Sequence, residues 1–370
     1  MKLAIVTPYF PPMVGGIETY LFELVNKLSK DNSVCVFTCG RGTTETYRDY
    51  TVKRLKALDV RNLPLNLGIP YPVPPTLMFE LAKDNFDLIH AHGHAFVTSF
   101  FAAAVARLTH KPFVLTIHDI GIAYHNYRVI RGIRPIVDST IVNFIIKQAS
   151  TVITLNNATY DYIKNFRPKR IEMIPQGIDL SKFNPKENEG DGRYVTFISA
   201  RLTEQKGGET FVKAIPTVLN EVPDAQFMII GDGIQKSQLQ RLCKDLDIDN
   251  YVRFVGRIPY SEVPKYLSQS KMVVFPSEIP TGLALLEAAA AKKAVITTAN
   301  PWALETLGET PLFIEERNHI DVARAITYLL KDPTERSKLA KRSWLKVAST
   351  FGWKKVASKH TDLYNEILVR

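Results

Sequence analysis

The stretch YVTFISARLTEQKGGETFVKAIPTVLN, residues 194–220, decides the fold class of this chain. Its first seven residues, Tyr194–Ala200, are mostly β-branched, aromatic or small, and they predict a buried strand. A polar turn with the glycine pair Gly207-Gly208 follows, and apolar residues then recur at helical spacing over Glu209–Asn220. A strand that leads through a glycine turn into a helix is the repeating unit of parallel α/β sheets. The stretch therefore predicts an α/β fold.

The same alternation runs along both halves of the chain. In the first half, the apolar strand Leu3–Thr7 leads into Ile17–Leu28, which has helical spacing. Between the halves, Met173–Tyr194 interrupts the alternation with prolines, glycines and charged residues, a composition typical of a linker. We therefore expect two doubly wound parallel-sheet domains, residues 1–185 and 186–352, with ligands beyond the carboxyl ends of the strands.

Length and composition limit the classes of protein that this chain can be. Its 370 residues, 45% hydrophobic and 23% charged, suit two or three globular domains and exclude a mostly disordered chain. No apolar run reaches the ~20 residues that span a bilayer, and no signal peptide precedes the first strand. Three scattered cysteines form neither a disulfide framework nor a zinc site. The sequence therefore predicts a cytoplasmic protein.

The net charge and the histidines restrict the kinds of ligand and partner that the sequence predicts. A net charge of 47 − 37 = +10 favours anionic partners, but no basic patch interleaved with aromatic residues supports nucleic acid. His90, His92 and His94 alternate along a strand, which is compatible with a metal site or with a polar loop. No carboxylate or cysteine cluster completes a metal shell, so we expect no metal and no cofactor.

Three segments after predicted strands could bind an anion or a polyhydroxylated ligand. Gly15 and Gly16 open a helix whose backbone N–H groups can approach an anion, unless they serve the turn alone. Arg201 and Lys206 stand before Gly207-Gly208 and a helix, a pattern that suits a diphosphate; the alternative is a solvated basic loop.

The third segment is an apolar helix that contains one carboxylate. Gly282 opens a run of small apolar residues in which Glu287 is the only charged side chain. A buried carboxylate needs a partner, because an unpaired one is costly. Either a ligand rich in hydroxyls or an internal hydrogen-bond partner would supply it.

Together these segments resemble the retaining glycosyltransferases of family 4, which have the GT-B fold. Single matches are weak, but the ordered set is specific and spans nearly the whole chain. The matching stretches are Pro11–Leu28, Asp87–His92, Thr116–Asp119, Ile174–Phe183, Arg201–Gly207, Ile229–Gly233, Val252–Gly256 and Pro276–Val295.

The resemblance implies a domain layout and a set of site residues. Two Rossmann-like domains would face a central cleft, with the acceptor in the first and the nucleotide-sugar donor in the second. A last helix, within 353–370, would cross back onto the first domain. The implied catalytic residues are His118 beside the transferred sugar, Arg201 and Lys206 on the diphosphate, and a carboxylate near the sugar. The implied donor-binding residues are Gly15, Gly16, Arg201, Lys206, Gly233, Ile258, Gly282, Leu283 and the ribose-binding Glu287.

One match to the family pattern fails. The family places a first glutamate eight residues before the ribose-binding one, where this chain has Ile279. Because Pro280 restricts Ile279 to extended conformations, the side chains of Glu278 and Ile279 should point to opposite sides. Sugar hydroxyls need hydrogen-bond partners, so we predict that Glu278 faces the donor sugar and replaces the missing carboxylate.

The segment Tyr124–Gln148 has two interpretations. Three arginines precede an apolar continuation, so the segment could rest on an anionic membrane surface and present a lipid-linked acceptor. The alternative is a core helix behind an arginine-rich loop. The first interpretation would make the protein peripheral at the cytoplasmic face of a membrane.

The sequence as a whole predicts a retaining hexosyltransferase. It would move a sugar from a nucleotide-diphosphate sugar to the hydroxyl of a glycan, lipid-linked or small-molecule acceptor. Two alternatives are a sugar-nucleotide epimerase of the same fold, which needs no acceptor, and a non-catalytic partner subunit, which the residue at 279 would explain.

Overall fold

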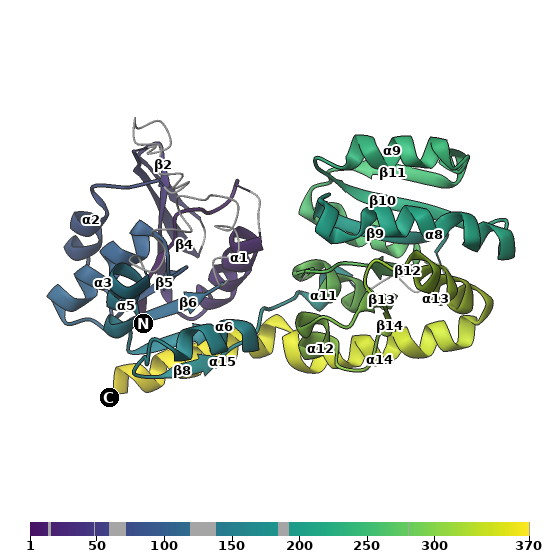
Figure 1. Cartoon of the computed structure of the whole chain (residues 1–370). Coiled ribbons are helices and arrows are strands. Elements are labelled where there is room, and N and C mark those ends of the chain that lie inside the picture. The colour runs from purple at the N-terminus through teal and green to yellow at the C-terminus, as the bar shows by residue number, and fades with distance from the viewer. Residues whose placement is uncertain are drawn as a thin grey trace. The chain divides into compact units, whose positions relative to one another are not determined.

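The chain divides into two compact units (Figure 1). The structure is a computed structural model that describes residues 1–13, 16–47, 49–58, 72–118, 138–183, 192–279 and 281–369. The first unit comprises Met1–Gly177 with Trp353–Arg370, and the second comprises Ile178–Gly352. The division thus falls shortly before the predicted boundary at residue 185, which lies outside the described residues.

The first unit is built on an eight-stranded sheet of order β3-β4-β2-β1-β5-β6-β7-β8. All its pairs are parallel except β3 with β4, which is antiparallel. The strands are β1 (Lys2–Val6), β2 (Ser33–Gly40), β3 (Thr43–Thr46), β4 (Tyr50–Lys56), β5 (Leu88–His92), β6 (Phe113–Ile117), β7 (Thr151–Thr154) and β8 (Ile171–Met173).

Helices cover both faces of this sheet. Along β1, Ala4 and Val6 belong to one hydrophobic cluster and Leu3 and Ile5 to another, because successive side chains of a strand point to opposite faces. Both faces are therefore buried, as in other mainly parallel sheets. The described helices are α1 (Gly16–Leu28), α2 (Leu77–Lys83), α3 (Val97–Thr109), α5 (Asn143–Gln148), α6 (Asn157–Lys164) and the C-terminal α15 (Trp353–Val369).

The second unit has a six-stranded, wholly parallel sheet of order β11-β10-β9-β12-β13-β14. Its strands are β9 (Tyr194–Arg201), β10 (Gln226–Asp232), β11 (Val252–Gly256), β12 (Ser270–Phe275), β13 (Ala294–Thr298) and β14 (Leu312–Ile314). Two parallel-sheet α/β units confirm the predicted fold class, and β9 begins at the residue that the sequence predicts.

Helices bury both faces of the second sheet as well. In β10, Phe227 and Ile229 pack into one cluster and Met228 and Ile230 into another. The helices are α7 (Leu180–Phe183), α8 (Gly208–Glu221), α9 (Lys236–Asp245), α10 (Val263–Ser268), α11 (Leu283–Ala290), α12 (Pro301–Leu307), α13 (His319–Lys331) and α14 (Pro333–Phe351). Single helical turns lie at η4 (Glu204–Lys206), η5 (Asp249–Tyr251) and η6 (Tyr260–Glu262).

The arginine-rich segment is only partly described. Residues 119–137 lie outside the described residues, and the remainder forms a helical turn, η3 (Asp138–Val142), that continues into α5. Val142, Ile145 and Ile146 are fully buried in the core of the first unit. These three side chains therefore fit the core-helix interpretation of Tyr124–Gln148. Among the described helices, none combines the length and the apolar character needed to cross a bilayer.

Candidate active site

The site residues predicted in the second unit gather at one edge of its sheet. Arg201 ends β9, and Gly233, Ile258 and Glu278 follow β10, β11 and β12. These four strands are neighbours and parallel, so their carboxyl ends meet at the same edge. Strand order thus brings together residues that span nearly 80 positions of the sequence.

The turn that carries Lys206 requires a glycine at its end. Gly207 has φ = +78° and directly precedes α8. A Cβ atom at Gly207 would lie 1.9 Å from the carbonyl oxygen of Pro276, which follows β12. Only a residue without a side chain allows this approach, which brings the turn of Lys206 against the segment that follows β12.

Arg201 and Lys206 form a cationic pair beside the start of a helix. Arg201 is exposed and Lys206 is partly buried. Burial, and then the positive charge of Arg201, lower the pKa of Lys206 to about 8. The first N–H groups of α8, which spans 14 residues, add the positive end of a helix dipole. An anion at this place would relieve the repulsion between the two cations, which is the environment that a diphosphate needs.

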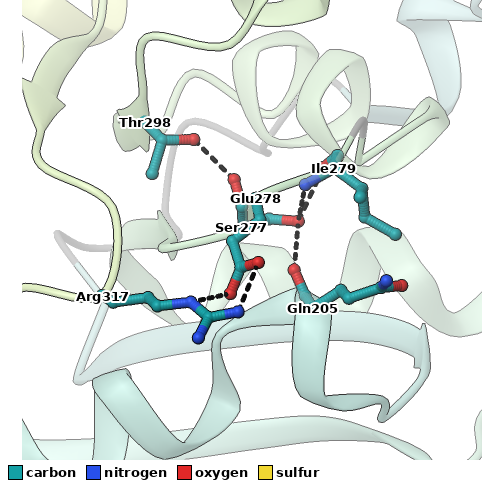
Figure 2. Close-up of polar contacts among 6 residues, drawn as sticks. All are labelled: Gln205, Ser277, Glu278, Ile279, Thr298 and Arg317. Atoms are coloured by element: carbon teal, nitrogen blue, oxygen red, sulfur yellow. Dashed lines mark hydrogen bonds and ion pairs between the residues drawn. The ribbon is translucent and has the colours of Figure 1, made fainter.

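The segment Ser277–Ile279 is tied to the same turn (Figure 2). The N–H of Glu278 and the hydroxyl of Ser277 both donate to the carbonyl oxygen of Gln205, at 3.0 and 3.2 Å. From the other side, the Thr298 hydroxyl at the end of β13 donates to the Ser277 carbonyl at 2.6 Å. Residue 278 therefore has a defined position next to Lys206, even though the segment is an irregular loop.

The carboxylate of Glu278 is held by an arginine that the sequence did not suggest. Nε and Nη2 of Arg317 donate to the two carboxylate oxygens at 2.7 and 2.8 Å, and Figure 2 shows the Ile279 side chain directed elsewhere. Arg317 lies between β14 and α13 with φ = +55°, a conformation that is costly for a residue with a side chain. No sequence pattern links the two residues, which are 39 positions apart.

Glu287 is a buried carboxylate for which the described part of the chain offers no hydrogen-bond partner. It lies on α11 with 5% of its surface exposed, as its apolar neighbours in the sequence predict. Within the described part of the chain, no side chain or backbone group forms a hydrogen bond with its carboxylate. Burial alone raises its pKa to about 7. The carboxylate thus needs an external donor, such as a ligand hydroxyl.

Three further predicted residues lie where α11 begins and beyond the end of β11. Gly282 caps α11 with φ = +64°, and apart from its two chain neighbours no heavy atom of the described residues lies within 4 Å of the position that its Cβ would take. Leu283, the first residue of α11, and Ile258 are both partly buried against the same hydrophobic cluster as Phe275. The beginning of α11 therefore borders open space on one side and an apolar surface on the other.

In the first unit, the predicted residues again follow neighbouring strands. Gly16 begins α1 after β1 and is exposed, whereas Gly15 lies outside the described residues. His118 directly follows β6, and its Nε2 lies 3.1 Å from Nδ1 of His92, the last residue of β5. The ring of Tyr20, from α1, meets the His118 ring edge-on at a centroid distance of 5.2 Å. In the sequence, His92 belongs to the histidine run and to the family-like stretch Asp87–His92, but neither pattern gives it a role of its own.

The other histidines of the run point to protein partners. His90 is fully buried, with Nδ1 at 2.7 Å from the Tyr364 hydroxyl and Nε2 at 2.7 Å from the Thr116 hydroxyl. Both ring nitrogens of His90 are thereby used within the protein. His90 therefore offers no free ring nitrogen to a metal ion in this structure.

Two family models match the chain one after the other. A model described as Glycosyltransferase Family 4 matches residues 14–182, and a model described as Glycosyl transferases group 1 matches residues 180–344. The chain is 26% identical to a GDP-mannose-dependent alpha-(1-6)-phosphatidylinositol monomannoside mannosyltransferase of Mycolicibacterium smegmatis, over 92% of this chain and 93% of that protein.

Solved structures share the fold. Sucrose-phosphate synthase from Thermosynechococcus elongatus aligns with a TM-score of 0.75 and 20% identity, over 100% of this chain and 99% of that one. HepE from Anabaena, in complex with UDP, aligns with a TM-score of 0.76 and 16% identity, over 99% and 100%. Since the two family models together match residues 14–344 and each unit has the parallel α/β sheet of a GT-B domain, the chain belongs to glycosyltransferase family 4.

Proposed function

We propose that the protein transfers a sugar from a nucleotide-diphosphate sugar to an acceptor hydroxyl, with retention of anomeric configuration. The second unit would bind the donor and the first unit the acceptor. The observation that carries the proposal is Glu287, a buried carboxylate that has no hydrogen-bond partner among the described residues, on the helix that follows β12, the strand next to that of Arg201. A nucleotide-diphosphate sugar offers ribose hydroxyls to the carboxylate and two phosphates to Arg201 and Lys206.

The proposed chemistry rests on stabilising the leaving group. Negative charge develops on the diphosphate as the glycosidic bond breaks, and Arg201, Lys206 and the start of α8 are placed to stabilise it. His118 is assigned a contact with the transferred sugar by resemblance to the family. Retention would follow from attack on the same face of the sugar, assisted by the leaving phosphate, without a protein nucleophile.

Glu278 is proposed to contact the donor sugar while it stays bound to Arg317. A carboxylate has about four acceptor sites, and the two N–H groups of Arg317 use two of them. The remaining sites can accept hydroxyl groups of the sugar. The salt bridge orients the carboxylate, which would compensate for the family glutamate that Ile279 replaces.

The names of the relatives suggest which donors to test first. The mycobacterial relative is named as dependent on GDP-mannose, and HepE was solved in complex with UDP-glucose. A thermal-shift panel of GDP-mannose, UDP-glucose and ADP-glucose ranks the donors, since a tenfold preference corresponds to about 1.4 kcal/mol. We expect one nucleotide to be clearly preferred. No shift with any nucleotide sugar would contradict the donor assignment.

Product analysis then tests the reaction. Incubation of the preferred donor with and without an acceptor, either a phosphatidylinositol mannoside or a soluble glycoside, should give a new glycoside only with acceptor. NMR of the product should show the anomeric configuration of the donor. An altered nucleotide sugar without acceptor would identify an epimerase, and binding without turnover would identify a non-catalytic subunit.

Metal independence is part of the proposal. The charge stabilisation assigned to Arg201, Lys206 and the start of α8 replaces the role of a divalent cation on the diphosphate. We expect the same transfer rate before and after treatment with EDTA. Activity that returns only on addition of Mg²⁺ or Mn²⁺ would show that a metal takes part.

A further inference from the structure

His92 and His118 form a hydrogen-bonded pair at the ends of two neighbouring strands. His92 ends β5 and His118 directly follows β6, its parallel neighbour. Nδ1 of His92 lies 3.1 Å from Nε2 of His118. His92 is fully buried, whereas His118 is partly exposed. The buried ring is thus in a position to orient the more accessible one.

The second nitrogen of His92 restricts where its proton can be. Nε2 of His92 is buried and has no hydrogen-bond partner among the described residues. The ring of His90, which is tilted by 38° at a centroid distance of 4.1 Å, already uses both of its nitrogens. Burial lowers the pKa of His92 well below 6.5, so its ring carries a single proton.

That single proton allows two arrangements of the pair. With the proton on Nε2, His92 would bury an N–H group that has no acceptor and would receive a hydrogen bond from His118. With the proton on Nδ1, His92 would donate to Nε2 of His118 and leave only a lone pair without a partner. A buried N–H without an acceptor is the rarer and costlier of the two, so the second arrangement is favoured.

We propose that His92 is a positioning residue whose Nδ1–H donates to Nε2 of His118 and thereby holds the proton of His118 on Nδ1. The role of His118 toward the sugar rests on the proposed function, whereas the tautomer of His118 does not. In this tautomer the His118 ring is neutral, and any contact made through its Nδ1 is made as a hydrogen-bond donor. A proton on Nε2 of His118 would require His92 to carry its own proton on its buried Nε2, which has no acceptor among the described residues, so a role of His118 Nε2 as a general acid or base is disfavoured.

The tautomer can be read directly by NMR. In protein labelled with ¹⁵N-histidine, long-range ¹H–¹⁵N correlations distinguish Nδ1–H from Nε2–H, and a His118→Gln variant assigns the signals. We expect His118 of the unaltered protein to carry its proton on Nδ1. A proton on Nε2 would overturn the proposal, whatever the protein does to sugars.

Variants of His92 test whether this residue sets the tautomer. His92→Leu keeps the volume but removes the donor, so the proton of His118 should move toward Nε2, the usual site in a free histidine side chain. His92→Asn places an amide nitrogen the same number of bonds from the backbone as Nδ1, and should restore the Nδ1–H form. His90→Leu removes an equally buried histidine that does not bond to His118, and should leave the tautomer unchanged.

Activity supplies the second measurement. We expect His92→Leu to lower kcat/KM about tenfold and His92→Asn to recover most of that loss, because only the latter can donate. An unchanged His118 tautomer in His92→Leu would overturn the positioning role. If the tautomer responds but turnover does not, the tautomer stands and the contact of His118 with the sugar is wrong.

Discussion

Arg201 at the end of β9 and Lys206 in the turn that follows are like charges, and burial followed by the charge of Arg201 lowers the pKa of Lys206 to about 8. We predict that Arg201→Ala and Lys206→Ala will each lower turnover roughly 10²-fold or more, because both charges would act on the leaving diphosphate. Steady-state kinetics with the preferred donor measures the effect. The control is Lys213→Ala on α8, the helix that follows, where an exposed lysine pairs with Glu209 at 2.7 Å. Equal turnover in all three variants would remove the diphosphate assignment.

The salt bridge between Glu278 and Arg317 gives a second prediction for single residues. Glu278→Gln should lower kcat/KM at least about tenfold, and Arg317→Gly should lower it by a similar factor, because the carboxylate would lose its orientation. In the Glu278→Gln background, Arg317→Gly should not lower kcat/KM any further, since the arginine acts through the carboxylate.

Glycine at position 317 separates function from stability in this experiment. It tolerates φ = +55°, so relief of backbone strain should offset the lost ion pair and keep the free energy of unfolding within about 1 kcal/mol. Additive effects of the two substitutions on kcat/KM would mean that Arg317 contacts the ligand directly. An unaffected Glu278→Gln variant would instead remove Glu278 from the sugar site.

At the scale of secondary-structure elements, two glycines that directly precede helices provide a matched comparison. Gly207 precedes α8 and Gly282 precedes α11, both with positive φ. A Cβ at Gly207 would meet the Pro276 carbonyl, whereas one at Gly282 would meet no atom within 4 Å. We predict that Gly207→Ala lowers the free energy of unfolding by about 3 kcal/mol or more and Gly282→Ala by about 1–2 kcal/mol.

Urea denaturation followed by circular dichroism measures this difference. The first substitution combines backbone strain with a collision between two segments, and the second has backbone strain alone. Equal losses of stability in the two variants would show that the close approach between the η4 turn and the end of β12 does not contribute.

At the scale of the whole molecule, the two units should respond to pH in opposite directions. Burial lowers the pKa values of His90, His92 and His360 in the first unit, that of His360 to about 4. In the unfolded chain their pKa values return to about 6.5. Above that pH these histidines therefore make their full contribution to the free energy of unfolding. It falls by about 1.4 kcal/mol per pH unit for each histidine as pH drops below 6.5.

Glu287 gives the second unit the opposite dependence. Its pKa of about 7 in the folded protein lies above the ordinary 4.5, so the folded state binds more protons between these values. The free energy of unfolding of the second unit should therefore rise by about 1.4 kcal/mol per pH unit as pH falls from 7 toward 4.5. This window lies mostly above the range in which exposed carboxylates titrate.

Native-state hydrogen exchange, read on peptides of each unit and corrected for intrinsic rates, can follow both responses between pH 7.5 and 5.5. We expect the first unit to lose protection and the second to gain it. Glu287→Gln should abolish the gain in the second unit and leave the first unit unchanged. A parallel loss in both units would show that Glu287 is ionised in the folded protein throughout this range.

Much of the candidate site could be predicted because it depends on local sequence. The glycine pair before α8, the two cations and the carboxylate within an apolar helix are patterns of a few residues, and the structure places them at one sheet edge. What could not be predicted are the partners of Glu278 and His118. Arg317 lies 39 residues from Glu278, and His92 lies 26 residues from His118.

By itself, the sequence determined the α/β class, the division into two halves and the burial of Glu287, because strand and helix periodicity and hydrophobic burial act over short stretches. The tertiary structure alone decided which side chains meet. His90 reaches Tyr364 of the C-terminal helix across 274 residues because strand order and helix packing place them together. Contacts of this kind depend on the order of strands in a sheet, and no local pattern in the chain encodes that order.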